Sequence, residues 1–199
     1  MATFFSKAAG ALLLVGATQF IIFLVIAETV YPDYSVSHNY ISDLGVWGKP
    51  SAPFFNVSTM IFGLCVIAGA YFIHREFDSR VIAALFGAAG LGALGVGIFP
   101  ENTFVVHGIP IIHTISAGTG FVVGGIAAIA SFKFSKPPMR YISVVLGAAA
   151  LVAAVLFRAT KDSNYLGLGV GGMERMVAYP TLLFLMGFGG YLLALHSNR

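Results

Sequence analysis

The sequence predicts an all-α fold: a bundle of six transmembrane helices, with both termini in the cytoplasm and polar extracytoplasmic loops forming a lid. Hydrophobic residues make up 58% of the 199 residues, charged residues only 10%, and the mean hydropathy is +0.89. A soluble domain carries about 25% charged residues, so lipid must be the solvent for much of this surface. The apolar residues also fall into six long runs, which leave room for a single helical domain over residues 1–199.

The first apolar run covers residues 8–30, and Gln19 and Glu28 are its only strongly polar interruptions. A helix of this length crosses about 30 Å of hydrocarbon at about 1.5 Å per residue. A signal peptide is the alternative, because Lys7 precedes the run. The run exceeds the usual core of about 7–15 residues and no clear cleavage site follows it, so we expect a retained helix.

The other five runs follow at intervals along the chain. They cover residues 53–73, 81–99, 111–132, 141–157 and 176–195. None of them alternates as a barrel strand does, and each is about twice as long as such a strand. The connection over residues 158–175 is rich in glycine towards its end, and we expect it to be a flexible loop.

Lysine and arginine are divided unevenly between the two sides that six crossings create. The side of the termini holds seven (Lys7, Arg75, Arg80, Lys133, Lys136, Arg140, Arg199), and the other side holds four (Lys49, Arg158, Lys161, Arg175). By the positive-inside rule both termini lie in the cytoplasm, and we expect a multi-pass protein of the cell membrane. Six of the eight acidic residues lie on the outer side: Glu28, Asp33, Asp43, Glu101, Asp162 and Glu174.

Small residues recur at helical spacing on the third and fourth runs. On the fourth run the stripe is Ser116, Gly120, Gly124 and Ala128, and on the third it is Ala84, Ala88 and Gly92, with Ala89, Ala93 and Gly97 beside it. Such stripes let two backbones approach closely in lipid, so the two spans should form a tightly packed hairpin. A seam between two copies of the chain, in a homo-oligomer, is the alternative interpretation.

Nucleic acid and nucleotides are not favoured as partners or cofactors. The net charge of +3 fits cytoplasmic anchoring, and no basic run with interleaved aromatic residues is present. The glycines at 167–172 lack the preceding strand and the Lys-Ser/Thr ending of a phosphate loop. Haem needs two facing histidines at similar depth, and only His113 lies inside a span on the outer side. A divalent metal stays open as a cofactor.

The outer connections gather the polar residues that could form a site. The first gives Asn39, Ser42 and Asp43, the second gives Glu101, His107 and His113, and the third gives Arg158, Glu174 and Arg175. Several of them, Glu28 included, lie at the ends of spans, where an unpaired charge is costly. We therefore expect them to pair with one another or with a ligand.

A metal site is one interpretation of this cluster, with His107, His113, Asp43 and Glu101 as ligands. In a continuous helix the two histidine rings would lie about 240° apart, but Gly108 and Pro110 break the helix, so the rings could still converge. The alternative is that each histidine donates a hydrogen bond to a neighbouring carboxylate or carbonyl group.

A hydrolase is a second interpretation, with Ser42 as nucleophile, His107 or His113 as base, and Asp43 or Glu101 orienting that base. No nucleophile elbow surrounds the serine, and a Ser-Asp pair also caps free backbone donors.

The arginines of the outer side allow two roles. Arg175 could hold Asp43 or Glu101 in a bidentate pair that clamps the loops. Alternatively, Arg158 or Arg175 could bind a lipid phosphate.

Three signatures resemble a family of membrane proteins known as domain of unknown function DUF998. They are N-Y-I-S-D-L-G at 39–45 with Asn56 beyond it, F-P-E at 99–101 with H-G at 107–108 and His113, and G-x-x-E-R at 171–175. The resemblance implies a multi-helix integral membrane protein without an assigned activity. The residues it marks are Asn39, Ser42, Asp43, Glu101, His107, His113, Glu174 and Arg175.

Three functions remain open from the sequence. The first is a membrane enzyme or binding protein whose partner is a membrane lipid or other amphiphile, acted on at the outer leaflet through Asp43, Glu101, His107 and His113. The second is a transporter or channel, which the near absence of charge in the middle of the spans disfavours. The third is a structural or assembly subunit whose polar cluster only ties the loops together.

Overall fold

The computed structural model of the chain describes residues 4–159 and 167–195, and within them the chain forms six α-helices. These are α1 (Phe4–Val30), α2 (Ala52–Phe77), α3 (Arg80–Ile98), α4 (Ile111–Ala130), α5 (Met139–Ala159) and α6 (Gly169–Ala194). All six are long and apolar enough to cross a membrane, which confirms the predicted six-helix membrane fold. Lys161, Asp162 and Arg199, which entered the charge count, lie outside the described residues.

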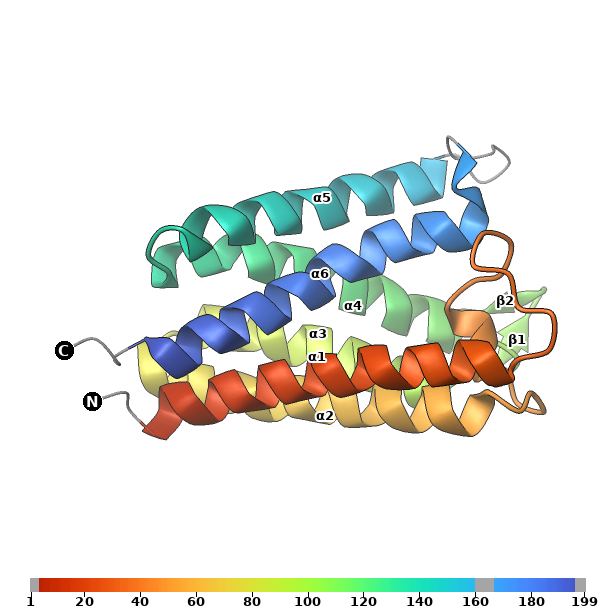
Figure 1. The fold of residues 1–199 in the computed structure, drawn as a ribbon, viewed down its shortest axis with the longest axis horizontal. Coiled ribbons are helices and arrows are strands. Elements are labelled where there is room, and N and C mark those ends of the chain that lie inside the picture. The colour runs from red at the N-terminus through yellow and green to blue at the C-terminus, as the bar shows by residue number, and fades with distance from the viewer. Residues whose placement is uncertain (1–3, 160–166, 196–199) are drawn as a thin grey trace.

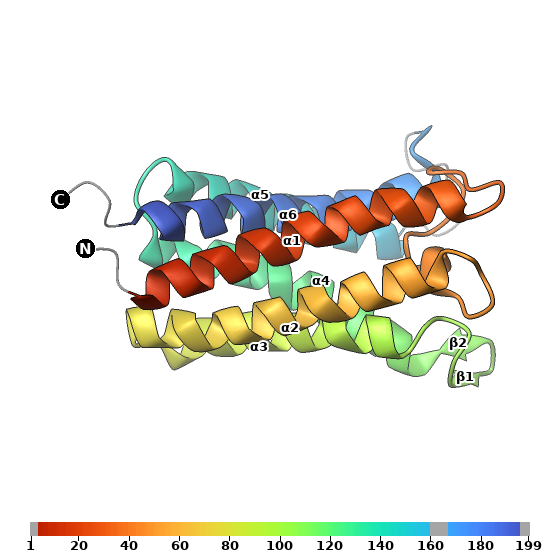
Figure 2. The same ribbon diagram turned by 60° about the horizontal axis from the view of Figure 1, so that its bottom comes forward.

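The helices run side by side and the two termini lie at the same end of the bundle (Figure 1). We call this the terminal end, and we call the opposite end, where the α1–α2 and α3–α4 connections and the start of α6 meet, the loop end. Each helix packs on the next in the chain, and α1 packs on α6 to close the bundle. Figures 1 and 2 show α5 on the side away from α2.

Glycine allows neighbouring helices to approach within backbone contact. A Cβ atom added at Gly92 of α3 would lie 2.7 Å from the carbonyl oxygen of Ser116 in α4. One added at Gly10 of α1 would lie 2.6 Å from the carbonyl oxygen of Gly189 in α6. Similar contacts join Gly63 to Gly90 and Gly125 to Gly147. In lipid such contacts supply the packing energy between helices, and they confirm the tight hairpin of α3 and α4.

The start of α6 differs from the sequence prediction. The helix begins at Gly169, seven residues before the predicted boundary, so the expected flexible loop is wrong for residues 169–175. The backbone N–H of Gly171 donates to the carbonyl oxygen of Ser37 at 3.0 Å, and a side chain at Gly171 would collide with the carbonyl oxygen of Asn39. Glycine's low helix propensity predicted a loop, but here glycine is what lets the α1–α2 connection rest on the helix.

Two short elements shape the connections at the loop end. A 3₁₀ helix, η1 (Ser42–Gly45), lies in the α1–α2 connection, and a hairpin of β1 (Val105–Val106) and β2 (Ile109–Pro110) lies in the α3–α4 connection. The hairpin turn is His107–Gly108, with φ values of 49° and 77°. Positive φ at both central residues is the geometry of a type I′ turn, which joins two strands tightly. At the terminal end the 3₁₀ helix η2 (Ser131–Phe134) extends α4.

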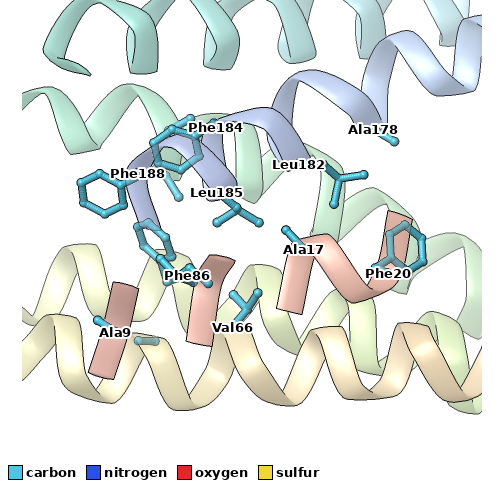
Figure 3. Close-up of a cluster of buried hydrophobic side chains, with 14 of the residues drawn as sticks. Ala9, Ala17, Phe20, Val66, Phe86, Ala178, Leu182, Phe184, Leu185 and Phe188 are labelled. Carbon is cyan, nitrogen blue, oxygen red and sulfur yellow. The ribbon is translucent and has the colours of Figure 1, made fainter. Parts of the chain in front are cut away.

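Aromatic side chains fill the terminal half of the bundle interior. Phe184 and Phe188 of α6 stack with ring centroids 5.4 Å apart, and Phe86 of α3 lies 5.9 Å from Phe188. Figure 3 shows these rings together between α3 and α6. All three are buried. They fill the interior towards the terminal end.

Candidate functional site

The interior of the loop-end half holds a cavity of about 110 Å³. Its walls come from α2, α3, α4 and α6, with Phe20 of α1 and with Ile41 and Ser42 above it. On α6 the lining runs from Glu174 to Leu185, which is about 16 Å at 1.5 Å per residue. An apolar cavity of about 150 Å³ is known to hold benzene. The present cavity is smaller than that, so it has room for one narrow apolar segment and none for a second beside it.

The ionisable groups of the lining, His113 and Glu174, lie at one end of this cavity, where they meet Ser42 and Glu101. The Ser42 hydroxyl donates to Oε1 of Glu101 at 2.5 Å and lies 3.4 Å from Oε1 of Glu174. The backbone N–H of Ile41 donates to Oε2 of Glu174. The Ser42 hydroxyl thus faces two carboxyl groups, and its one proton can form a full hydrogen bond with only one of them. We call Ser42, Glu101, His113 and Glu174 the carboxylate cluster.

His113 completes this cluster from α4. Its Nδ1 lies 2.9 Å from the carbonyl oxygen of Phe99, and since a carbonyl can only accept, Nδ1 carries the hydrogen. Its Nε2 then points at Oε1 of Glu101, 3.6 Å away. In a neutral ring this nitrogen is an acceptor that faces a carboxyl oxygen, and a proton on the Glu101 carboxyl makes that contact attractive.

Burial is the main influence on the charge of Glu101. It raises the pKa of this carboxyl above the ordinary glutamate value, and the neighbouring Asp43 raises it further. The Ser42 hydroxyl and His113 act in the opposite direction without cancelling the rise. Glu101 therefore takes up a proton at a higher pH than an exposed glutamate does.

Two hydrogen-bond sets position the connections that carry these groups. Asp43 accepts from the backbone N–H of Tyr40 at 2.9 Å and from the Asn39 amide at 3.2 Å, which fixes the segment before η1. The side chain of Asn102 bonds both the N–H and the carbonyl of Trp47, at 3.1 and 3.2 Å. This second set holds the α3–α4 connection against the α1–α2 connection and so brings Glu101 to Ser42.

Arg175 forms a separate network on the other side of α6. Its Nη2 donates to Oε1 of Glu28 at 2.5 Å and to the Tyr34 hydroxyl at 2.7 Å. Its Nη1 donates to the carbonyl oxygens of Val36 and Gly171, at 3.1 and 3.0 Å. We call this network the arginine clamp. The prediction that Arg175 pairs with Asp43 or Glu101 is therefore wrong. Consecutive residues of a helix point about 100° apart, and Glu174 is the residue that faces those two carboxyl groups.

Tyr34 is the neutral member of the arginine clamp. Burial raises its pKa to about 12, so the phenol keeps its proton. That proton is donated to the carbonyl oxygen of Tyr40 at 3.1 Å, while the oxygen accepts from Arg175. Its ring supports Arg175 as well, at 5.7 Å. This role could not be predicted from the sequence, because a tyrosine near a span end is typical of an interface anchor.

The predicted site residues therefore separate into groups. Ser42, Glu101, His113 and Glu174 converge, Asn39 and Asp43 shape the loop beside them, and Arg175 lies in the clamp. His107 and Arg158 are exposed, and neither lines the cavity. The hairpin turn holds His107 away from the bundle, and Arg158 lies in the last turn of α5, which contributes no lining residue. Their roles in binding or catalysis stay predictions.

Neither predicted reaction centre is assembled. Among the residues that the structure describes, no group of three or more His, Cys, Asp or Glu side chains is arranged to hold a metal ion, so the four-ligand set of His107, His113, Asp43 and Glu101 is not formed. The Ser42 hydroxyl donates to Glu101 and not to a histidine, so the Ser-His contact of a hydrolase is also absent from the described part of the chain. The Glu101 carboxylate accepts the hydrogen bond that Ser42 would donate to a catalytic histidine.

The apolar cavity itself had no counterpart in the sequence prediction. Thr181 is one of its lining residues, and the Thr181 hydroxyl oxygen is buried and has no hydrogen-bond partner among the described residues. A helical threonine usually bonds the carbonyl four residues earlier. An occupant of the cavity, or an ordered water, would supply the missing bond.

Fold and cavity define this chain as a multi-pass α-helical membrane protein with a polar cluster capping an apolar interior chamber. It belongs to the DUF998 family: the model of that family, described as a protein of unknown function, matches residues 14–191, which include parts or all of the six helices. No curated protein and no solved structure matches the chain.

Proposed function

We propose that this protein binds a single-chain amphiphile of the membrane, with the apolar chain in the cavity and the polar head at the carboxylate cluster. The observation that carries the proposal is the polarity of the cavity. Its ionisable groups, His113 and Glu174, lie at one end, while its long wall is formed mainly by Phe, Val, Leu, Ala and Gly. A site of that form matches a molecule with one polar end.

The same observation ranks the other two functions lower. A pathway for hydrophilic solutes needs polar groups along its whole length. Here Phe86 and Phe184 lie at the inner part of the cavity, and the wall between them and the cluster offers only scattered hydroxyl groups. A cluster that only ties loops together needs no cavity beside it, because protein interiors are normally close-packed.

The charge distribution supports placing the loop end outside. The terminal end carries Lys7, Arg75, Arg80, Lys133, Lys136 and Arg140. By the positive-inside rule the amphiphile would then be taken from the outer leaflet of the cell membrane.

Cavity-filling substitutions test the proposal. Ala93 and Ala117 line the cavity, whereas Ala84 of α3 is exposed on the outside of the bundle. We expect protein purified in mild detergent to retain a single-chain amphiphile that mass spectrometry can identify. Ala93→Leu and Ala117→Leu should lower its amount at least tenfold, and the control Ala84→Leu should not change it.

Circular dichroism and the elution volume show whether each variant remains folded. If folded Ala93→Leu and Ala117→Leu retain as much amphiphile as the natural protein, or if only two-chain lipids copurify with all of them, the proposal is wrong.

A further inference from the structure

We infer that the head group taken by the carboxylate cluster is a protonated amine, whose entry displaces a proton from the cluster. This rests on the proposed function, because it assigns the polar end of the same amphiphile. Three features carry it: the sign of the groups around Ser42, the acceptors left without a donor, and the full commitment of the nearest guanidinium group.

The groups that meet at Ser42 are acidic and come from three parts of the chain. Asp43 belongs to η1, Glu101 to the α3–α4 connection and Glu174 to α6. Among the described residues that line the cavity, His113 is the one titratable base. An occupant with a positive charge would balance this excess of carboxyl groups, and an anionic head would increase the repulsion.

Two acceptors of the cluster lack a full hydrogen bond. Oε1 of Glu174 has only the 3.4 Å contact with the Ser42 hydroxyl, which bonds Glu101 more closely. Nε2 of His113 has no hydrogen bond among the described residues, only the 3.6 Å contact with Glu101. Glu174 and His113 are 6% and 4% exposed, and both line the cavity. Each atom therefore has lone-pair capacity left for an occupant that donates.

An ammonium group fits this pair. It offers three N–H donors and no acceptor, which allows it to serve Glu174, Glu101 and the free lone pair of His113 together. A phosphate or carboxylate head offers oxygens, which these groups cannot bind. Arg175 cannot assist such a head, because its four hydrogen bonds go to Glu28, Tyr34 and two backbone carbonyls, where α6 faces α1.

The proton that the ammonium group would replace is the one held on Glu101. Glu101 faces Asp43 from η1, Glu174 from α6 and His113 from α4. Burial raises the pKa of Glu101, which strengthens the hold on that proton. Exchange of a proton for an ammonium group leaves the charge of the site nearly unchanged. Because the proton and the ammonium group compete for the same carboxylate, binding should tighten as pH rises.

Four probes with the same alkyl chain test the head group: dodecylamine, dodecanol, dodecanoate and dodecyl phosphate. Each is titrated into the full-length protein in lipid nanodiscs, and its Kd is measured by calorimetry. We expect dodecylamine to bind at least tenfold more tightly than dodecanol, and the two anions to bind more weakly still. Its Kd should fall about tenfold between about pH 5.5 and about pH 7.5, with release of protons to the buffer.

The probes separate failure of this inference from failure of the proposed function. Equal binding of dodecanol and dodecylamine, abolished for both by Ala93→Leu, would overturn the amine head group and leave the cavity as the binding site. If no probe shows binding that Ala93→Leu removes, the proposed function itself fails.

Glu101→Gln tests the proton exchange, because the amide keeps an acceptor for Ser42 but cannot ionise. The preference for dodecylamine over dodecanol should fall about tenfold, and the pH dependence of its Kd should flatten. Glu174→Gln provides a second variant if the first does not fold. The control is Asp33→Asn, which removes one negative charge from an exposed position of the same connection as Asp43. An unchanged preference and pH dependence in the folded Gln variants would overturn the inference.

Discussion

The arginine clamp and the carboxylate cluster are two buried polar networks that start from neighbouring residues of α6. In the clamp Arg175 meets the carboxylate Glu28 and the neutral Tyr34, and its two terminal nitrogens together make four hydrogen bonds. In the cluster two carboxyl groups share the single proton of Ser42, and one face borders the cavity. A network whose charges and hydrogen bonds are balanced is typical of a structural role. A network that lacks donors and borders a cavity is typical of a binding site.

The helical repeat produces this division. Glu174 and Arg175 point about 100° apart on α6, so one faces the interior cavity and the other faces α1. If the comparison is right, changes in the clamp should reduce stability, and changes in the cluster should alter binding and pH dependence while stability changes little.

The largest effect is expected for Arg175→Met. It leaves Glu28 without its cation at the edge of the membrane, and breaking a buried ion pair costs about 3–5 kcal/mol. Denaturant titration of the purified protein measures this loss in the free energy of unfolding. The control Arg158→Met, at an exposed position of α5, should change it by no more than about 0.5 kcal/mol. Equal effects of the two variants would contradict the structural role of the clamp.

A smaller loss is expected for Tyr34→Phe. The substitution removes the hydroxyl that joins Arg175 to the carbonyl oxygen of Tyr40, and an orphaned buried group costs about 1–3 kcal/mol. Tyr31→Phe is the matched control in the same connection. A loss of stability as large in the control would show that the ring environment matters and the hydrogen bonds do not.

Filling the cavity should act in the opposite direction. Ala93→Leu adds apolar volume where the natural protein has space, and such substitutions commonly raise the free energy of unfolding by about 0.5–2 kcal/mol. The same variant should lose amphiphile. A marked loss of stability instead would mean that the cavity wall is too rigid to accept the added volume.

The smallest effect is a change of pH dependence in Glu101→Gln. Because the pKa of Glu101 is raised by burial, the folded protein holds this proton more tightly than the unfolded chain does. The resulting stability is complete below the ordinary glutamate pKa of about 4.3 and is lost as pH rises through the raised value. Thermal unfolding at a series of pH values should show this decline in the natural protein and a flatter profile in Glu101→Gln.

Composition and periodicity were sufficient to predict the six spans, because a run of about twenty apolar residues has few alternatives. The start of α6 could not be predicted the same way. Gly169 and Gly171 have low helix propensity, and only their contact with the α1–α2 connection explains why they are helical.

The site was predictable in part. Charge at a span end identified His113 and Glu174, but it identified Arg158 equally, and residue type could not separate His107 from His113. The cavity had no sequence signal. Gly97 meets the α2 backbone, whereas Ala93, four residues earlier in the same stripe of small residues, lines the cavity. The difference depends on where the neighbouring helices lie.

The β1–β2 hairpin makes the sidedness of this protein accessible to experiment. Its turn, His107–Gly108, projects from the loop end, and neither residue lines the cavity. Exposed turns of this kind accept inserted sequence because few contacts are disturbed. An epitope tag placed there would report by antibody staining of intact cells which face of the bilayer it occupies, without touching the helices that hold the ligand.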